Sequence, residues 1–380
     1  MATLRIAWHD YNMGEDGFNI YRSDTPMDVS AMPSPIASVG PNVGAYTDST
    51  VTGGQSYYYR IGVLRNGEEL ISDEQKLYAF NFALMSVSVD NIVKKTDIDG
   101  NEVWSFAGHT NNVRSIVIDS NENVYSGSQD NTVRKIDSSG NEVWSFTGNT
   151  SYVTGVAIDS NNGYVYSISS NQTVRKINSN TGDEVTTGGW PFTGHSDKIS
   201  GVAVDSNNEY VYTASDDNTV KKIDPDGNEV TSGGWPFTGH SAPLSGVTVD
   251  QNTGNIYSVG SYNDRTIRKI DPNGNQIWSF SRSNPMYGQP VIDSNGYVYM
   301  GDDGGTIFKV NPANGSLVNS ESWPFTAHTD GIYDISIDSE DNIYSSSKDG
   351  TARVIDSTGN EIRTYIDQIG TFPIAVYLDY

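Results

Sequence analysis

Short runs of alternating apolar and polar residues fill most of the chain, and they return at regular intervals. In residues 191–235, one alternating run covers 199–204, a second covers 210–215 and a third covers 219–223. Turns rich in Asn, Asp, Gly and Pro separate these runs. Period-two alternation between such turns is typical of β-strands joined by hairpins. We therefore expect each unit to form a small antiparallel sheet, here with a fourth strand that runs up to Trp235.

A large aromatic residue closes each unit, and successive closing residues are 40 to 46 positions apart. They are Trp104, Trp144, Trp190, Trp235, Trp278, Trp323 and Tyr365. A repeat of this length holds the four strands of one β-propeller blade. The pattern therefore favours a propeller, in which each blade packs against its two neighbours.

The two ends of the repeat region complement each other. Residues 82–104 match the last three strands of a unit but lack its first strand, and residues 370–379 match a first strand. An open array would leave two unpaired sheet edges, so these segments are expected to pair and close the ring. The sequence thus predicts a seven-bladed propeller over residues 81–380, with one split blade built from 82–104 and 370–379.

Residues 1–80 lack the repeat and form a separate predicted domain. Strand patterns occur at 4–8, 17–22, 35–39, 45–48, 56–64 and 69–71, with a hairpin signal at 65–68. They predict a small β-sandwich, and the stretches 17–23, 46–51 and 57–63 resemble a fibronectin type III domain. The chain starts near the second strand of that fold, so the first strand is either absent, which we favour, or supplied by a partner. The expected fold class is all-β: a small fibronectin type III-like sandwich followed by a seven-bladed β-propeller closed by a split blade.

The propeller region resembles WD-repeat proteins in its Gly-His pairs, which are Gly108-His109, Gly194-His195 and Gly239-His240. Ile-Asp dipeptides such as Ile136-Asp137 stand where that family has Trp-Asp, and the stretches 140–146 and 295–310 look more like quinoprotein-type repeats. The WD-repeat resemblance implies that the histidines are structural hydrogen-bonding residues. It also implies that one face of the propeller binds a partner.

Composition excludes several classes of function. The formal net charge of -24 argues against nucleic acid and against anionic membranes as partners, since both require clustered Lys and Arg. The absence of Cys removes disulfides, thiolate nucleophiles and Cys-based zinc sites. The first residues lack the apolar run of a signal peptide, so classical secretion is not expected.

Acidic turns offer one weak metal hypothesis. Asp97 and Asp99 lie in one Asp-x-Asp-Gly-Asn-Glu turn, and Asp224 and Asp226 lie in another, so each turn brings several hard oxygens together as calcium requires. The glycine is at the fourth position rather than the sixth position of an EF-hand loop. We therefore favour turn chemistry over calcium and expect no cofactor. Asp and Lys residues that recur in every repeat are expected to be structural as well.

The loops that precede the first strand of each unit vary most, and they carry the predicted ligand-binding residues. These are Tyr152, Lys198, Arg282, Met286, Tyr287 and Asp330. The segment 282–287 has lost the Gly-His pair and gained Arg, Met and Tyr, which are favoured in contact patches. Ordinary drift of loop sequence is the alternative explanation.

No catalytic motif or convergent acid and base is found, so no catalytic residue is expected. A fibronectin-like module joined to an acidic propeller favours an exposed accessory, decoration or adhesion protein of a virion, such as a phage, reaching the outside by lysis. The sandwich would dock to other virion or surface-assembly proteins, and the propeller would display a face for a host glycan or receptor. An intracellular, cytoplasmic WD-repeat-like scaffold is the main alternative. A non-classically secreted adhesin and a quinoprotein-like enzyme are further ones.

Overall fold

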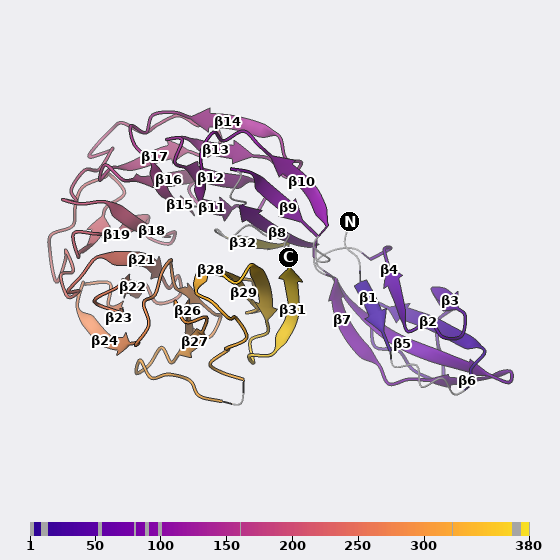
Figure 1. Ribbon diagram of the computed structural model, residues 1–380. Coiled ribbons are helices and arrows are strands. Elements are labelled where there is room, and N and C mark those ends of the chain that lie inside the picture. The colour runs from indigo at the N-terminus through magenta and orange to yellow at the C-terminus, as the bar shows by residue number, and fades with distance from the viewer. Residues whose placement is uncertain are drawn as a thin grey trace. The chain divides into compact units, whose positions relative to one another are not determined.

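The computed structural model describes residues 4–8, 14–51, 55–79, 81–87, 91–97, 101–159, 161–320, 322–366 and 374–379. The chain forms two compact units, one of Met1–Phe82 with Leu378–Tyr380 and one of Ala83–Tyr377. All regular elements in the described part of the chain are β-strands (Figure 1). The all-β class expected from the alternating pattern is therefore confirmed.

The N-terminal unit contains two sheets around one core. Strands β2 (Gly17–Ser23), β3 (Ala37–Val39), β5 (Gln55–Arg65), β6 (Glu68–Ile71) and β7 (Gln75–Ala79) form the larger sheet, and β1 (Leu4–Ala7) pairs with β4 (Ala45–Asp48). Ile20 and Tyr59 are among the most buried side chains of this core. Strand β7 was not predicted from the sequence. The fibronectin type III-like assignment stays a prediction.

Six consecutive repeats of the second unit each form one antiparallel sheet. We number these repeats 1 to 6. Repeats 1, 4 and 6 have four strands each. These are β11 (Val113–Ile118), β12 (Val124–Ser128), β13 (Val133–Ile136) and β14 (Glu142–Phe146) in repeat 1; β21 (Leu244–Val249), β22 (Ile256–Gly260), β23 (Thr266–Ile270) and β24 (Gln276–Ser281) in repeat 4; and β28 (Ile332–Ile337), β29 (Ile343–Ser347), β30 (Thr351–Ile355) and β31 (Glu361–Ile366) in repeat 6. Repeats 2, 3 and 5 have three strands each, which are β15 (Val153–Asp159), β16 (Tyr164–Ser169) and β17 (Val174–Asn178) in repeat 2; β18 (Ile199–Asp205), β19 (Tyr210–Ser215) and β20 (Val220–Ile223) in repeat 3; and β25 (Val291–Ile292), β26 (Val298–Gly301) and β27 (Ile307–Val310) in repeat 5.

One further sheet joins the two ends of the repeat region. Its strands are β8 (Asn81–Val87), β9 (Val93–Thr96), β10 (Glu102–Phe106) and β32 (Ile374–Asp379), in the order β10-β9-β8-β32. Figure 1 shows the sheets of this unit arranged around a centre, with first strands such as β11, β18 and β21 innermost. This arrangement is that of a β-propeller.

The prediction of a fourth strand up to Trp235 in repeat 3 is wrong. Repeat 3 has only the isolated bridges Ile223↔Glu229 and Val220↔Phe237 at this place, and repeats 2 and 5 also have isolated bridges there. In repeat 3 the segment contains Gly233-Gly234 followed by Trp235-Pro236. Glycine weakens a strand and proline lacks the N–H that a ladder needs, so regular pairing is interrupted.

The second strands are the most buried elements, because sheets cover both of their faces. Every described residue of β12, β22 and β29 is buried. Tyrosines of these strands are held by the acidic residues that end the first strands: Tyr125 donates to Asp119 at 3.0 Å and Tyr344 donates to Asp338 at 2.8 Å. The structural role expected for these recurring Asp residues is therefore observed.

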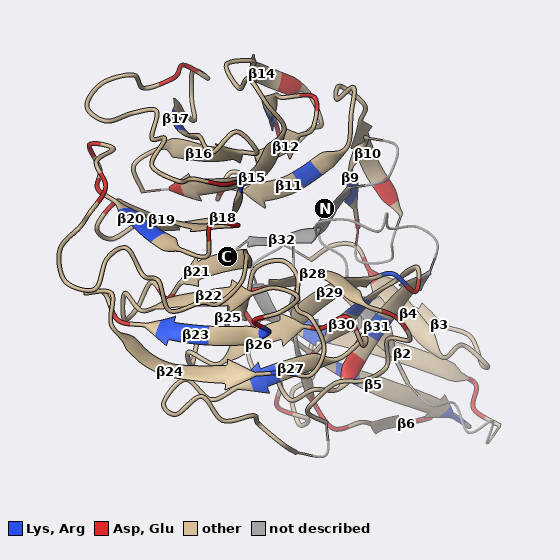
Figure 2. Cartoon of the chain, turned by 60° about the vertical axis from the view of Figure 1, so that its left-hand side comes forward, with Lys and Arg blue, Asp and Glu red and all other residues tan. Residues whose placement is uncertain are grey.

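Recurring lysines of the third strands link neighbouring sheets. Lys176 Nζ of repeat 2 donates to the Pro225 carbonyl oxygen of repeat 3 at 3.3 Å, and Lys222 donates to the Pro272 carbonyl oxygen of repeat 4 at 3.1 Å. Basic residues are visible on β20, β23 and β27 in Figure 2. These recurring lysines therefore serve the joints between blades.

Candidate binding site at the centre of the propeller

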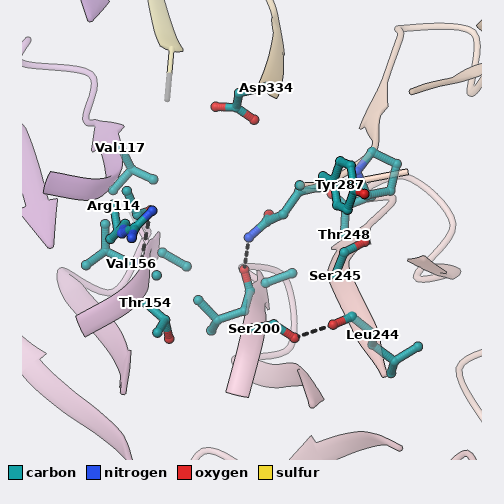
Figure 3. Close-up of a pocket in the computed structure, with 18 of the residues that line it drawn as sticks. Arg114, Val117, Thr154, Val156, Ser200, Leu244, Ser245, Thr248, Tyr287 and Asp334 are labelled. Carbon is teal, nitrogen blue, oxygen red and sulfur yellow. Dashed lines mark hydrogen bonds between the residues drawn. The ribbon is translucent and has the colours of Figure 1, made fainter. Parts of the chain in front are cut away.

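A cavity of about 1350 Å³ lies between the first strands of the propeller unit. Its described lining comes from β11, β15, β18, β21, β25 and β28 and from the loops next to them. Figure 3 shows Arg114 and Val117 on one side and Thr248 and Tyr287 on the opposite side. The volume exceeds the range of about 300–1,000 Å³ that is usual for small-molecule pockets.

Glycines let the first strands approach one another closely around this cavity. A Cβ on Gly201 would lie 2.8 Å from the Gly246 Cα, and a Cβ on Gly246 would lie 2.2 Å from the Gly288 carbonyl oxygen. Real Cβ atoms do not come so near to backbone atoms. The Gly at these positions is therefore required by the close packing of neighbouring blades.

Side-chain hydroxyls of the cavity wall are used to hold the next blade. Thr154 Oγ1 donates to the Ile199 carbonyl oxygen at 2.7 Å, and Ser200 Oγ donates to the Leu244 carbonyl oxygen at 2.6 Å (Figure 3). Gln289 Nε2 reaches from repeat 5 to the Val202 carbonyl oxygen of repeat 3 at 3.3 Å. These polar groups satisfy the inner strand edges, which explains why hydroxyl and amide side chains line the wall.

Three of the six predicted binding residues come together at this cavity. Tyr152 of repeat 2, Lys198 of repeat 3 and Tyr287 of repeat 5 all line it, and Tyr152 is 50% exposed. Lys198 Nζ lies 3.9 Å from Asp216 Oδ2, and burial raises the pKa of the Asp216 carboxyl. Tyr152, Lys198 and Tyr287 precede first strands, and Asp216, Tyr262 and Asn263 follow second strands, so in these antiparallel pairs all six lie at the same end. We call these six lining residues the channel mouth.

The other three predicted residues are placed differently. Met286 is fully buried in the core formed by repeats 4 and 5. Arg282 Nη2 bonds to the buried Asp302 Oδ2 at 2.8 Å, and its guanidinium lies 4.8 Å from the centre of the Phe308 ring. Asp330 is exposed but is not part of the cavity lining, and its carboxylate accepts the Gly331 N–H at 2.7 Å. Arg282 and Met286 therefore have structural contacts.

Sequence analysis missed Asp216, Tyr262 and Asn263. Tyr262 is 61% exposed and its ring contacts the Tyr287 ring at a centroid distance of 5.3 Å. The loop that carries Tyr262 and Asn263 is longer than its counterparts in the other repeats. That length difference was the available signal, and it could have been found by aligning the units residue by residue.

The histidines form buried hydrogen-bonded sets apart from the cavity. His109 Nδ1 lies 2.9 Å from Asp130 Oδ2, and its Nε2 lies 2.8 Å from Ser126 Oγ. Repeats 3, 4 and 6 reproduce this arrangement at His195, His240 and His328. None of these histidines lies in the described lining of the cavity. Their expected structural role is therefore observed.

Burial and hydrogen bonding set the charges of these sets. Burial lowers the pKa of His240 and His328, which favours neutral rings. Burial alone would raise the pKa of Asp264, but hydrogen bonds from His240, the Ser241 backbone and Thr266 outweigh it and hold the pKa well below its usual range. The arrangement therefore pairs an ionised aspartate with a neutral histidine.

The acidic turns use their carboxylates for turn hydrogen bonds. Asp224 Oδ1 accepts the Asn228 backbone N–H at 2.8 Å, and Asp97 Oδ1 accepts the Asn101 backbone N–H at 2.9 Å. The Asp226 carbonyl oxygen accepts the Gly189 N–H of the preceding repeat at 2.7 Å. Asp99 lies outside the described residues. Within the described ranges no group of three or more His, Asp and Glu side chains could hold a metal ion, and the calcium hypothesis stays a prediction.

The ring of sheets and its central cavity define a β-propeller. The family model described as outer membrane protein assembly factor BamB matches residues 89–190 and 170–375, and the chain belongs to this family. A similar solved structure is the WD40 β-propeller domain of Doa1, with a TM-score of 0.61 and 20% sequence identity over 72% of this chain and 88% of that chain. At this identity the similarity shows the fold alone. Comparison with curated proteins gives no match.

Proposed function

We propose that the chain is a non-enzymatic interaction scaffold whose propeller holds a partner protein at the channel mouth. The observation that carries this proposal is the convergence of Tyr152, Lys198 and Tyr287, from three different repeats, at one end of a single cavity. Exposed tyrosines favour interfaces because a large ring is buried at a small cost in side-chain entropy. The loops that differ between repeats thus supply a shared surface.

The family and the fold support a role in protein contacts. The family is described as an outer-membrane protein assembly factor, and assembly requires binding to other proteins. We infer further that the propeller has seven blades and is closed by the split blade, since the β10-β9-β8-β32 sheet stands beside six repeat sheets. A closed ring presents its loops on a rigid support, which suits a scaffold.

The chemistry of the described cavity supports a non-enzymatic role. Its hydroxyl side chains donate to carbonyl oxygens of neighbouring strands. The histidine and the aspartate of each set bond to one another outside the cavity lining. A quinoprotein-like enzyme remains the alternative that needs a test. Equilibrium dialysis of the full chain against a quinone cofactor would show saturable binding if that alternative were right.

The location of the protein follows as a finer proposal. An exposed position on a virion or other particle, with the N-terminal unit as the docking element, is supported by the separate core of that unit, which lies outside the family match. No membrane-spanning helix occurs in the described part of the chain. Density-gradient sedimentation of particles from the source, followed by mass spectrometry, would show co-sedimentation with capsid proteins. Recovery only from uninfected cytosol would favour the intracellular scaffold.

Site-specific photo-crosslinking tests the main proposal. A photo-reactive amino acid replaces Tyr152 at the mouth or, as the matched control, Ile277 on the outer strand β24; these side chains are 50% and 48% exposed. We expect one protein to be crosslinked from position 152 but not from 277, and the purified partner to bind the wild-type chain more tightly than Lys198→Ala. Equal crosslinking from both positions would overturn the assignment of the surface.

A further inference from the structure

Repeat 4 departs from the other repeats at one loop of the channel mouth. In repeat 3 the Asp216 N–H donates to the Lys198 carbonyl oxygen, and the next residue, Asp217, holds the histidine of its set. In repeat 4 the Ser261 N–H makes the equivalent bond to Pro243, but the histidine is held by Asp264. Tyr262 and Asn263 are therefore inserted between two positions that are adjacent in repeat 3.

The neighbouring repeat 5 departs at the facing segment. Met286 forms an isolated β-bridge with Asp302, at the position where Val113 of repeat 1 pairs with Ser128. Beyond this bridge, the first strand of repeat 5 is regular only at Val291–Ile292. Gly288, with φ of 80°, turns the chain in the left-handed region just after Tyr287. The two irregular segments are in contact, because the rings of Tyr262 and Tyr287 pack edge to face, with 5.3 Å between their centroids and an interplanar angle of 65°.

Two basic side chains beside this tyrosine pair already have protein partners. Lys348 forms an ion pair with Asp303 and lies 5.5 Å from the centre of the Tyr287 ring. Arg265 donates to the carbonyl oxygens of Tyr262 and Ser283 at 2.5 and 2.6 Å. The formal net charge of -24 additionally repels anionic ligands at long range. These cations are therefore already held by the protein, which leaves the tyrosine rings themselves for contact with a ligand.

A hydrogen-bonding side chain remains beside the exposed Tyr262 ring. Asn263 is exposed, and its amide makes no hydrogen bond to the described protein atoms, so it offers both a donor and an acceptor. Burial, together with the neighbouring Tyr262 hydroxyl, raises the pKa of Tyr287, so this phenol is neutral at physiological pH. An aromatic face next to a free amide suits a molecule with one apolar face and a hydroxyl-bearing edge.

We propose that the Tyr262–Tyr287 pair, with Asn263, binds a neutral oligosaccharide. A pyranose ring presents a C–H face that packs on an aromatic ring and equatorial hydroxyls that bond to an amide, and the open cavity admits several linked rings. The inference deepens the proposed function, since it names the chemistry by which the partner is recognised at the same mouth. The sugar is either a free polysaccharide or a glycan carried on a protein.

The test is calorimetric titration of the full chain with neutral hexasaccharides of glucose, mannose and N-acetylglucosamine. We expect one of them to bind, Tyr262→Ala to weaken it at least about ten-fold, and Asn263→Ala to weaken it by a smaller factor. The matched control is Ile277→Ala, an exposed apolar residue on the outer strand β24 of the same repeat and outside the cavity lining, which should change the affinity less than about two-fold. Tyr262 is 61% exposed, so its removal should leave the thermal midpoint unchanged, and Tyr262→Phe should retain most of the binding.

Further experiments distinguish the two sources of the sugar, and they separate failure of this proposal from failure of the scaffold proposal. A glycoprotein that carries the preferred sugar, titrated before and after enzymatic removal of its glycans, distinguishes a carried glycan from a free polymer. Absence of binding by every hexasaccharide, or binding that Tyr262→Ala leaves unchanged, would overturn the proposal. Binding of uncharged peptides in place of sugars, lost in Tyr262→Ala, would also overturn it. Crosslinking from position 152 can succeed in either case, so failure here is distinct from failure of the scaffold proposal.

Discussion

The indole Nε1 of Trp190 donates a hydrogen bond of 3.1 Å to the carbonyl oxygen of Pro225, which lies in a turn of the following repeat. Equivalent bonds of 3.0 to 3.1 Å join Trp104, Trp144, Trp235 and Trp278 to the next repeat. Trp323 differs, because its Nε1 is buried without a hydrogen-bond partner among the described residues. The closing aromatic of a repeat is thus a joint between blades.

Replacing Trp190 by Phe is expected to destabilise the propeller more than replacing Trp323 by Phe. Both indoles are buried, with 4% and 3% exposure, and each is followed by Pro and Phe, so loss of ring volume should cost a similar amount. Only Trp190→Phe also removes a hydrogen bond, which contributes about 1 kcal/mol. Urea unfolding of the two variants measures the difference. Equal free energies of unfolding would mean that the bond to Pro225 gives no net stability.

Gly246→Ala is expected to cost more than about 2 kcal/mol, because the new Cβ would lie 2.2 Å from the Gly288 carbonyl oxygen and the strands would have to separate. Gly155→Ala at the equivalent place in repeat 2 is the control. There the nearest atom is the flexible end of the Ile168 side chain, at 3.0 Å, which can move. Thermal melts of both variants test the prediction, and a similar loss in both would contradict it.

The propeller could be predicted from the sequence because its signals are local and repeated. Alternation gives strands, and the closing aromatics give the blade length. The prediction of a fourth strand up to Trp235 failed because the proline after Trp235 removes a ladder donor, an effect that the alternation pattern does not include. Strand β7 was missed because its pairing with β5 depends on contacts across the N-terminal unit.

The binding surface was predictable only in part. Tyr152, Lys198 and Tyr287 follow from loop variability, and they line the cavity. Met286 is buried because it lies opposite Asp302 as Val113 of repeat 1 lies opposite Ser128, so it occupies a core position of an irregular first strand although it resembles a loop residue. Register depends on strand pairing, so sequence alone does not separate a buried residue of an irregular strand from an exposed one.

Acid is expected to destabilise the propeller in two pH windows. The pKa of His240 and His328 is lowered in the folded state, so below pH of about 6.5 the unfolded chain binds protons that the folded chain does not, and stability falls. The pKa of Asp264 is also lowered, and its contribution, complete above pH of about 4, is lost below that value. Urea midpoints measured from pH 8 to pH 4 should therefore fall most steeply below pH of about 6.5.

The chain supplies a non-titrating version of this set. Asn149 and Asn171 stand in repeat 2 where the other sets have His and Asp, and Asn171 Nδ2 donates to Thr150 Oγ1 at 2.7 Å. The double variant His240→Asn/Asp264→Asn should be less stable at pH 8 but should show a shallower dependence on pH. Gly246→Ala, which is destabilised without loss of a titrating group, should keep the wild-type slope. An unchanged slope in the double variant would show that the set does not govern acid sensitivity.

Calcium is expected to leave the stability of the chain unchanged. Both carboxylate oxygens of Asp224 accept bonds from Asn228, from its backbone N–H at 2.8 Å and from its side-chain amide at 3.2 Å, so the turn is satisfied without a cation. Asp224→Asn keeps an oxygen that accepts the backbone N–H and should cost less than about 1 kcal/mol, whereas Asp224→Ala removes both bonds and should cost about 1–2 kcal/mol. Thermal midpoints with calcium and with a chelator measure the effect. A calcium-dependent rise in the wild type that both variants lack would establish a calcium site and reverse this interpretation of the acidic turns.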